Sequence, residues 1–155
     1  MKKTMKKLLS LVLALVLCIG CLPVSASAAG TFERISGSNR YKTAFAAADS
    51  LKSALGVGKF ENVVIASGTG FADALAGSYL AAVKKAPILL VNKDSVKDVA
   101  SYVSGNLVSG GTVYLLGGSA AVPAEMEAAL AGQNVKRLSG KNRYDTNLVI
   151  LQEQA

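Results

Sequence analysis

A short glycine-rich turn, Gly117-Gly118-Ser119, separates an apolar run that ends at Leu116 from a segment that begins at Pro123. Backbone N–H groups in such a strand-to-helix turn, together with the Ser119 hydroxyl, can bind an anion with help from the helix dipole. The same residues also suit a tight turn that needs the backbone freedom of glycine. We therefore take Gly117, Gly118 and Ser119 as candidate anion ligands, with a purely structural turn as the open alternative.

Two arginines, Arg40 and Arg143, are each predicted to lie in the first turn of a helix. A cation there opposes the helix dipole, at a cost of about 0.3–1 kcal/mol at an exposed site, so a negative group should compensate it. That group could be an anionic polymer bound from outside. It could also be a carboxylate of the same unit, and we expect a structural ion pair between Arg40 and Asp73. The same two alternatives apply to Arg34 and Arg137.

The sequence offers few groups for catalysis. It has no histidine, so neither a Ser-His-Asp triad nor a His-ligated zinc site can be built, and we expect no enzyme activity, metal or cofactor. The segment 67–70 (SGTG) matches part of a dinucleotide-binding loop, but Asp73 takes the place of the third glycine and would repel a pyrophosphate. We therefore expect no nucleotide ligand.

Alternating strands and helices must position these residues. Apolar runs predict strands at 62–67, 87–91 and 112–116, with shorter strands at 32–35 and 135–138. Helices are predicted over 40–55, 71–84, 95–107 and 123–130, and from Arg143 onward. Unbroken apolar strands are typical of a sheet that is covered on both faces. We predict an α/β fold, a three-layer parallel sheet with helices on both faces.

An internal repeat organises the chain. The segment 34–43 (RISGSNRYKT) returns at 137–146 (RLSGKNRYDT), identical at seven of ten positions and offset by 103 residues. Such self-similarity at a fixed period indicates a tandem-repeat module. We predict a first repeat over 29–136 and the truncated start of a second over 137–155. That start has no completed sheet to join, so we expect a frayed C-terminus or self-association.

The first 28 residues have the order of a secretory signal peptide. Four lysines precede an apolar run at 8–20, and Ala26-Ser27-Ala28 forms a cleavage site. The run of about 13 residues is too short to span a membrane, which needs about 20. A lipoprotein signal that uses Cys21 is the alternative. Cleavage lowers the net charge from +7 to +3, because four of the 17 Lys and Arg and none of the 10 Asp and Glu leave, and +3 does not indicate a nucleic-acid partner.

The combined motifs resemble the type 2 cell-wall-binding repeat of Gram-positive surface proteins. They are the two copies of the repeated segment, 66–82 (ASGTGFADALAGSYLAA), 87–90 (PILL) and 114–123 (YLLGGSAAVP). The resemblance implies a compact parallel α/β fold, usually in packed tandem threes, that holds a surface protein noncovalently on an anionic wall polymer. It also implies that a separate effector domain usually accompanies the repeats.

We therefore expect a secreted, non-catalytic module that binds the cell wall. Its expected partner is an anionic wall polymer or peptidoglycan, and packing with further repeats is also expected. Two alternatives stay open. The chain could be the N-terminal fragment of a secreted cell-wall hydrolase, such as an amidase, or it could be a homophilic surface-interaction module.

Overall fold

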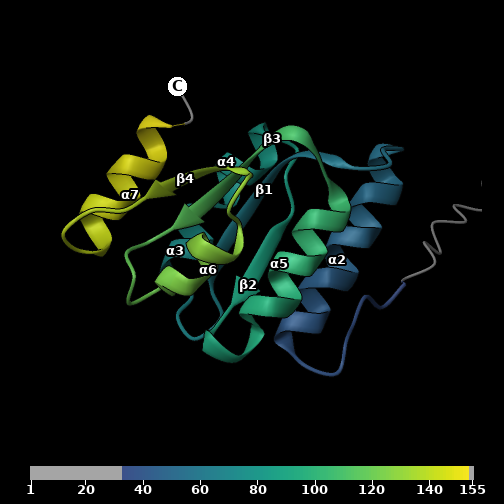
Figure 1. The fold of residues 1–155 in the computed structure, drawn as a ribbon, viewed down its shortest axis with the longest axis horizontal. Coiled ribbons are helices and arrows are strands. Elements are labelled where there is room, and N and C mark those ends of the chain that lie inside the picture. The colour runs from purple at the N-terminus through teal and green to yellow at the C-terminus, as the bar shows by residue number, and fades with distance from the viewer. Residues whose placement is uncertain (1–32, 154–155) are drawn as a thin grey trace, which may run out of the picture. The chain divides into compact units, whose positions relative to one another are not determined.

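The computed structural model describes residues 33–153, and from Arg34 onward these residues form one compact unit. Four parallel strands make a sheet in the order β2-β1-β3-β4 (Figure 1). The strands are β1 (Phe60–Ser67), β2 (Ile88–Val91), β3 (Leu107–Leu116) and β4 (Asn134–Leu138). The helices are α2 (Arg40–Leu55), α3 (Ala72–Ala76), α4 (Ser78–Val83), α5 (Val96–Asn106), α6 (Ala124–Ala129) and α7 (Arg143–Gln152), with a 3-10 turn η1 (Lys93–Ser95) before α5.

Two separate apolar cores lie on the two faces of this sheet. Because successive strand residues point to opposite faces, Val63 and Ile65 of β1 enter one core while Val64 and Ala66 enter the other. Helices α2, α5 and α6 cover the first face, and α3, α4 and α7 supply the second. The predicted three-layer parallel α/β fold is confirmed.

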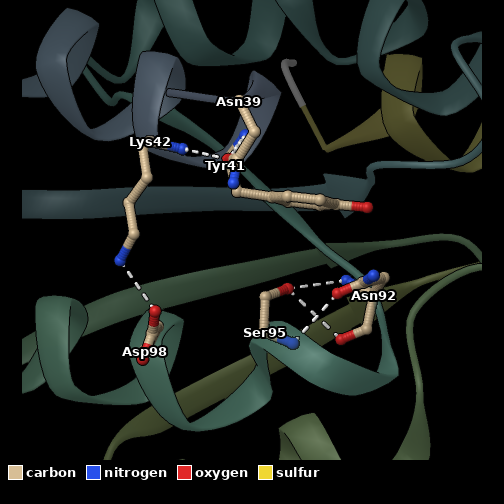
Figure 2. A network of polar contacts seen from close by, with 6 residues as sticks. All are labelled: Asn39, Tyr41, Lys42, Asn92, Ser95 and Asp98. Carbon is tan, nitrogen blue, oxygen red and sulfur yellow. Dashed lines mark hydrogen bonds and ion pairs between the residues drawn. The ribbon is translucent and has the colours of Figure 1, made fainter. Parts of the chain in front are cut away.

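The repeated sequence motif builds the start of a helix in both of its copies. The Asn39 Oδ1 atom accepts hydrogen bonds from the backbone N–H groups of Tyr41 and Lys42, both at 3.0 Å (Figure 2). In the second copy, Asn142 caps α7 through the N–H groups of Tyr144 and Asp145 at 2.8 and 3.0 Å. An N-cap of this kind stabilises a helix by about 1 kcal/mol.

The glycine and threonine of the motif also stabilise the start of the helix. The N–H of Gly37 donates to Thr43 Oγ1, and the N–H of Gly140 donates to Thr146 Oγ1, each at 3.0 Å. A side chain on either glycine would lie 2.6 Å from the backbone nitrogen of that threonine, which only glycine avoids. Helix initiation thus explains the repeated glycine, asparagine and threonine of the motif, without any ligand.

Several elements differ from the predictions. The predicted helix over 71–84 is two helices, α3 and α4, which meet at Gly77 beside the Leu116 side chain. The strand predicted at 32–35 is not formed by its described residues, 33–35. Residues 33–37 are exposed and have no regular structure. The signal peptide predicted over 1–28 lies outside the described residues. Within 33–153, no helix has the length and apolarity to cross a membrane.

The opening of the second repeat does join a sheet, which corrects the expectation that it would find none. Strand β4 pairs in parallel with β3, from Thr112 beside Asn134 to Leu116 beside Leu138. Helix α7 follows it, and Lys136 Nζ lies 2.5 Å from Glu153 Oε2 at the far end of that helix. The predicted boundary between residues 136 and 137 therefore falls inside β4, and the first sheet takes its fourth strand from the segment that opens the second repeat.

Candidate functional site

The carboxyl ends of the four strands meet at one edge of the sheet, which we call the carboxyl edge. The chain turns in opposite directions after β1 and β3, and ligands of open α/β sheets bind in the crevice at such a point. Hollows of about 320 and 520 Å³ lie there. Their shared lining comes from Thr69 of the loop after β1 and from Ala120 and Ala121 of the loop after β3. The predicted Gly117–Ser119 turn is part of this edge.

The loop after β1 is held by its own polar groups. The Ser67 Oγ atom accepts hydrogen bonds from the N–H groups of Thr69 and Gly70, both at 3.3 Å, and the N–H of Gly68 donates to the carbonyl of Val91 at 2.8 Å. Gly68 is buried, and the Tyr41 ring of α2 occupies the space that a side chain there would need. The loop is therefore fixed against α2 and β2.

Arg40 also contacts this loop. Its Nη1 atom donates a hydrogen bond of 2.7 Å to the carbonyl oxygen of Gly68. Within residues 33–153, the ion pairs closer than 4 Å do not include Arg40 with Asp73, so the structure does not bring that expected pair together. The arginine is compensated by a backbone carbonyl, while the rest of its side chain lines a third hollow of about 350 Å³ beside Phe71.

The Asp73 carboxyl is affected by the charge of Arg143, the arginine of the second copy of the motif. Burial raises the pKa of its carboxyl, and the positive charge of Arg143 lowers that pKa by a smaller amount. The Asp73 carboxylate also lies against the Cα atom of Gly117, where a side chain would collide with it. The fold thus places Asp73 beside the Gly117 turn and within electrostatic range of Arg143, although Asp73 and Arg143 belong to different repeats.

The Gly117–Ser119 turn uses part of its backbone for the fold. Gly117 is buried with φ +98°, a left-handed conformation that favours glycine, and its N–H donates to the Leu138 carbonyl at 2.8 Å. The carbonyl of Gly118 accepts from Ala121 and Val122 at 2.9 and 3.0 Å. Among residues 33–153, no protein acceptor is found for the N–H groups of Gly118 and Ser119. Those two groups are the part of the turn that can meet a ligand.

Arg137 has a structural role at this edge. Its Nη1 atom donates to the carbonyls of Gly117 and Val122 at 2.9 and 3.2 Å, and its Nε donates to Glu127 Oε2 at 3.0 Å. The Nη2 atom lies 2.9 Å from the same carboxylate, but it is off the hydrogen-bonding direction and makes no hydrogen bond within the described residues. For Arg137 the compensating negative group is therefore a carboxylate of the protein itself, that of Glu127. Its counterpart Arg34 is exposed.

A set of lysines at the opposite edge was missed from the sequence. A hollow of about 540 Å³ lies near the amino ends of the strands, and Lys59, Lys84 and Lys85 line it together with Glu61. Lys84 and Lys85 follow α4, whereas Lys59 immediately precedes β1. Only the parallel β1–α4–β2 crossover brings the end of the helix back beside the start of the strand. The spacing of the lysines in the sequence gave no sign of this cluster.

Comparison with known proteins identifies the family. The sequence model of cell wall binding domain 2 (CWB2) matches residues 34–127. The chain belongs to the CWB2 family. This CWB2 match stops before β4 and α7, which nevertheless complete the sheet and its second face.

Curated relatives and a solved structure agree with the CWB2 assignment. The chain is 32% identical over 124 residues to the N-acetylmuramoyl-L-alanine amidase LytC of Bacillus subtilis (strain 168), covering 79% of this chain and 24% of LytC. It is 32% identical over 120 residues to the amidase enhancer of the same organism, covering 72% of this chain and 16% of that protein. Cwp8 from Clostridium difficile has the same fold, with TM-score 0.60 and 29% identity, over 78% of this chain and 19% of Cwp8.

The CWB2 chain thus spans about a quarter or less of the relatives it matches. Like the proteins of this family, it is a secreted protein associated with the cell wall. Within the described residues, no group of three or more acidic, histidine or cysteine side chains is arranged to hold a metal ion.

Lys42 and Asp98 tie the first helix of the CWB2 fold to α5. Lys42 Nζ lies 2.7 Å from Asp98 Oδ2, and the Phe45 and Tyr102 rings stack at 4.6 Å between centroids. Figure 2 shows the lysine of α2 reaching down to α5, whose entry is fixed by reciprocal hydrogen bonds between Asn92 and Ser95. The first helix is therefore held by its own repeat.

Proposed function

We propose that this CWB2 module is non-catalytic and anchors a secreted protein noncovalently to the Gram-positive cell wall by binding an anionic wall polymer. The observation that carries the proposal is the CWB2 match over residues 34–127. An anionic ligand also agrees with the mature charge of +3, which is too small to act at long range and so requires cations in suitable places.

The first proposed place is the carboxyl edge. The turn at Gly117, Gly118 and Ser119 supplies the two N–H groups without a protein acceptor in the described residues, and Arg40 and Arg143 supply positive charge near the same loops. The Asp73 carboxylate weakens this edge for an anion when it is ionised. The burial that raises its pKa acts in the opposite sense.

The second place is the hollow lined by Lys59, Lys84 and Lys85, where three cations face one carboxylate, Glu61. Lysine ammonium groups suit a flexible phosphate- or carboxylate-bearing polymer, because they need no fixed bidentate geometry. Binding at the carboxyl edge and binding at the amino edge can therefore be distinguished, because different side chains would retain the protein on the wall.

Retention of the mature chain on purified cell walls tests both places. Ser119→Asp adds a negative charge at the carboxyl edge, and Ser101→Asp, on the exposed surface of α5, is its charge-matched control. Lys59→Gln with Lys84→Gln removes charge at the amino edge, and Lys97→Gln with Lys141→Gln removes the same charge elsewhere. The edge that binds the polymer is the one whose variant loses retention at unchanged melting temperature while its control does not.

Stripping the anionic polymer from the walls tests the ligand itself. We expect retention of the unmodified chain to fall on stripped walls and to fall with salt, since charge attraction is screened within about 3 Å at 1 M ionic strength. Equal retention on stripped walls overturns the anionic-polymer proposal and favours peptidoglycan.

A second candidate comes from the two amidase-related proteins of Bacillus subtilis. The chain could be the wall-binding part of a secreted hydrolase, with the hydrolase residing in the portion of such a protein that the alignment does not cover. In either case we propose that residues 33–153 only bind. Incubation of the mature chain with purified peptidoglycan should release no new amino groups, and measurable release would contradict this.

A further inference from the structure

Helices α2 and α7 are the same element in successive repeats, 103 residues apart, and α2 shows what this helix buries. Tyr41 lies against Gly68, the Phe45 ring stacks on Tyr102 of α5, and Ala48 is 2% exposed in the first core. One face of α2 is thus covered by the sheet and the α5 helix of its own repeat.

The corresponding face of α7 is uncovered within the described residues. Tyr144, Leu148 and Leu151 occupy the positions of Tyr41, Phe45 and Ala48, and they are 76%, 57% and 48% exposed. These three side chains follow helical spacing and form one apolar stripe, which we call the forward face. Three large exposed apolar side chains on one face of a helix indicate an interaction site.

A different face of α7 is already buried. Ile150 is 0% exposed in the second core and Thr146 is 4% exposed, so α7 packs on the sheet of the first repeat through this backward face. The equivalent positions of α2 are the small, exposed Ala47 and the half-buried Thr43. The two helices therefore share a start motif but use opposite faces against the first sheet. Figure 1 shows α7 beside β4 and α2 beside α5.

We propose that α7 is a shared helix whose forward face docks under the sheet of the second repeat. The occupant is a β2–α5 surface of the kind that covers α2, with a glycine opposite Tyr144 and an aromatic side chain opposite Leu148. The argument is internal, because the first repeat displays both the helix face and the surface that covers it. One helix would then join two sheets, so consecutive repeats could not be separated without exposing an apolar face.

The neighbouring helices extend the uncovered surface. Helix α3 packs against α7, and the exposed apolar side chains of α3, α4 and the residue before them are Phe71, Leu75, Tyr79 and Val83. Exposed apolar side chains are thus present on α7 and on the helices beside it, and a large exposed apolar surface marks an interaction site. A second repeat docked on α7 would border this surface.

The test places one substitution in two contexts. The first is the mature chain of this protein. The second is an extended chain in which a copy of residues 49–136 directly follows Leu151, so that α7 continues into a complete second repeat. In the mature chain, Leu148→Asp should leave the melting temperature unchanged, because the side chain is exposed.

In the extended chain the same Leu148→Asp should lower the melting temperature of the second sheet by about 10 °C or more, because a charge is then buried. Ser101→Asp in the first repeat is the control, and it should have no effect in either context. Amide exchange in α7 should slow when the second repeat is present and speed up again with Leu148→Asp.

Three results would overturn the proposal. The first is equal tolerance of Leu148→Asp in both contexts. The second is a dimer of the mature chain that Leu148→Asp dissociates, since a second copy is then the occupant. If the extended chain does not fold its second sheet, the forward face can be made identical to that of α2 by Asn147→Ala, Leu148→Phe and Leu151→Ala. If amide exchange in α7 of that variant is no slower than in the mature chain, this third result also overturns the proposal. Slower exchange supports the docking face.

Discussion

Arg137 Nη1 donates a 2.9 Å hydrogen bond to the carbonyl oxygen of Gly117, and this bond ties β4 to the turn that follows β3. The same guanidinium reaches Val122 and Glu127, so one side chain holds both ends of the β3–α6 loop. The loop that presents Gly118 and Ser119 is therefore held in place by a side chain of β4.

Arg137→Lys should lower the free energy of unfolding by about 1.5–3 kcal/mol, because lysine cannot reproduce the fork that reaches two carbonyls and a carboxylate. Urea unfolding of the mature chain measures this. The matched control is Arg34→Lys, which makes the same change at the equivalent, exposed position of the first repeat and should be neutral. Equal effects of both variants would show that the Arg137 contacts do not stabilise the fold.

Gly68→Ala should destabilise the fold by about 1–3 kcal/mol, because its methyl group would overlap the Tyr41 ring. Gly70→Ala is the control in the same loop, where a methyl group meets no atom within 4 Å. Adding Tyr41→Ala to Gly68→Ala should cost less than the sum of the two single changes. Thermal unfolding of the parent, the two single variants and the double variant gives the coupling energy between Gly68 and Tyr41. Strict additivity would argue against this contact.

The Asp73 carboxyl should titrate above its ordinary range, because its burial raises its pKa more than Arg143 lowers it. Arg143→Gln should raise the pKa of Asp73 further. Arg40→Gln should leave it unchanged, since Arg40 hydrogen-bonds the Gly68 carbonyl. Carbon-detected NMR titration of the carboxyl distinguishes the two arginines, and a larger response to Arg40→Gln would restore the Arg40–Asp73 pair.

The raised pKa of Asp73 predicts the sign of a pH dependence of the stability. Because the folded-state pKa is raised, the fold favours the neutral carboxyl. Its contribution is full below the unfolded-state pKa and is lost as the pH rises through the folded-state pKa. Asp73→Asn should therefore raise the melting temperature at pH 7 and have less effect at pH 3. A lower melting temperature at pH 7 would mean that the carboxylate stabilises the fold in its ionised form.

The parallel sheet could be predicted because its strands are covered on both faces. The apolar runs at 62–67, 87–91 and 112–116 lie within or overlap β1, β2 and β3, and helices over 40–55 and from Arg143 onward are present. The break at Gly77 could not be predicted, since it depends on the Leu116 side chain of a strand far along the chain.

The candidate site was less accessible to sequence reasoning. The turn at 117–119 and Arg40 lie at the carboxyl edge, but spacing along the chain cannot say which arginine approaches Asp73. The sequence offers Ser38 or Asn39 as the cap of the helix that begins at Arg40, and the structure shows that Asn39 is the cap. The part that Gly37 and Thr43 take in the same helix start depends on a contact across six residues, which the sequence does not indicate. The two copies of the motif also differ in strand pairing, because β4 has β3 as a neighbour while the exposed residues 33–35, equivalent to 136–138, have no strand beside them among the described residues.

The late arrival of β4 has a consequence for how the protein leaves the cell. A secreted chain emerges amino end first, so β3 keeps an open edge until residues 134–138 have crossed the membrane and paired with it. Each completed sheet then resists backward movement of the chain, because unfolding would be needed to reverse it. In an array with this spacing, an open sheet edge of this kind would wait for its last strand once every 103 residues.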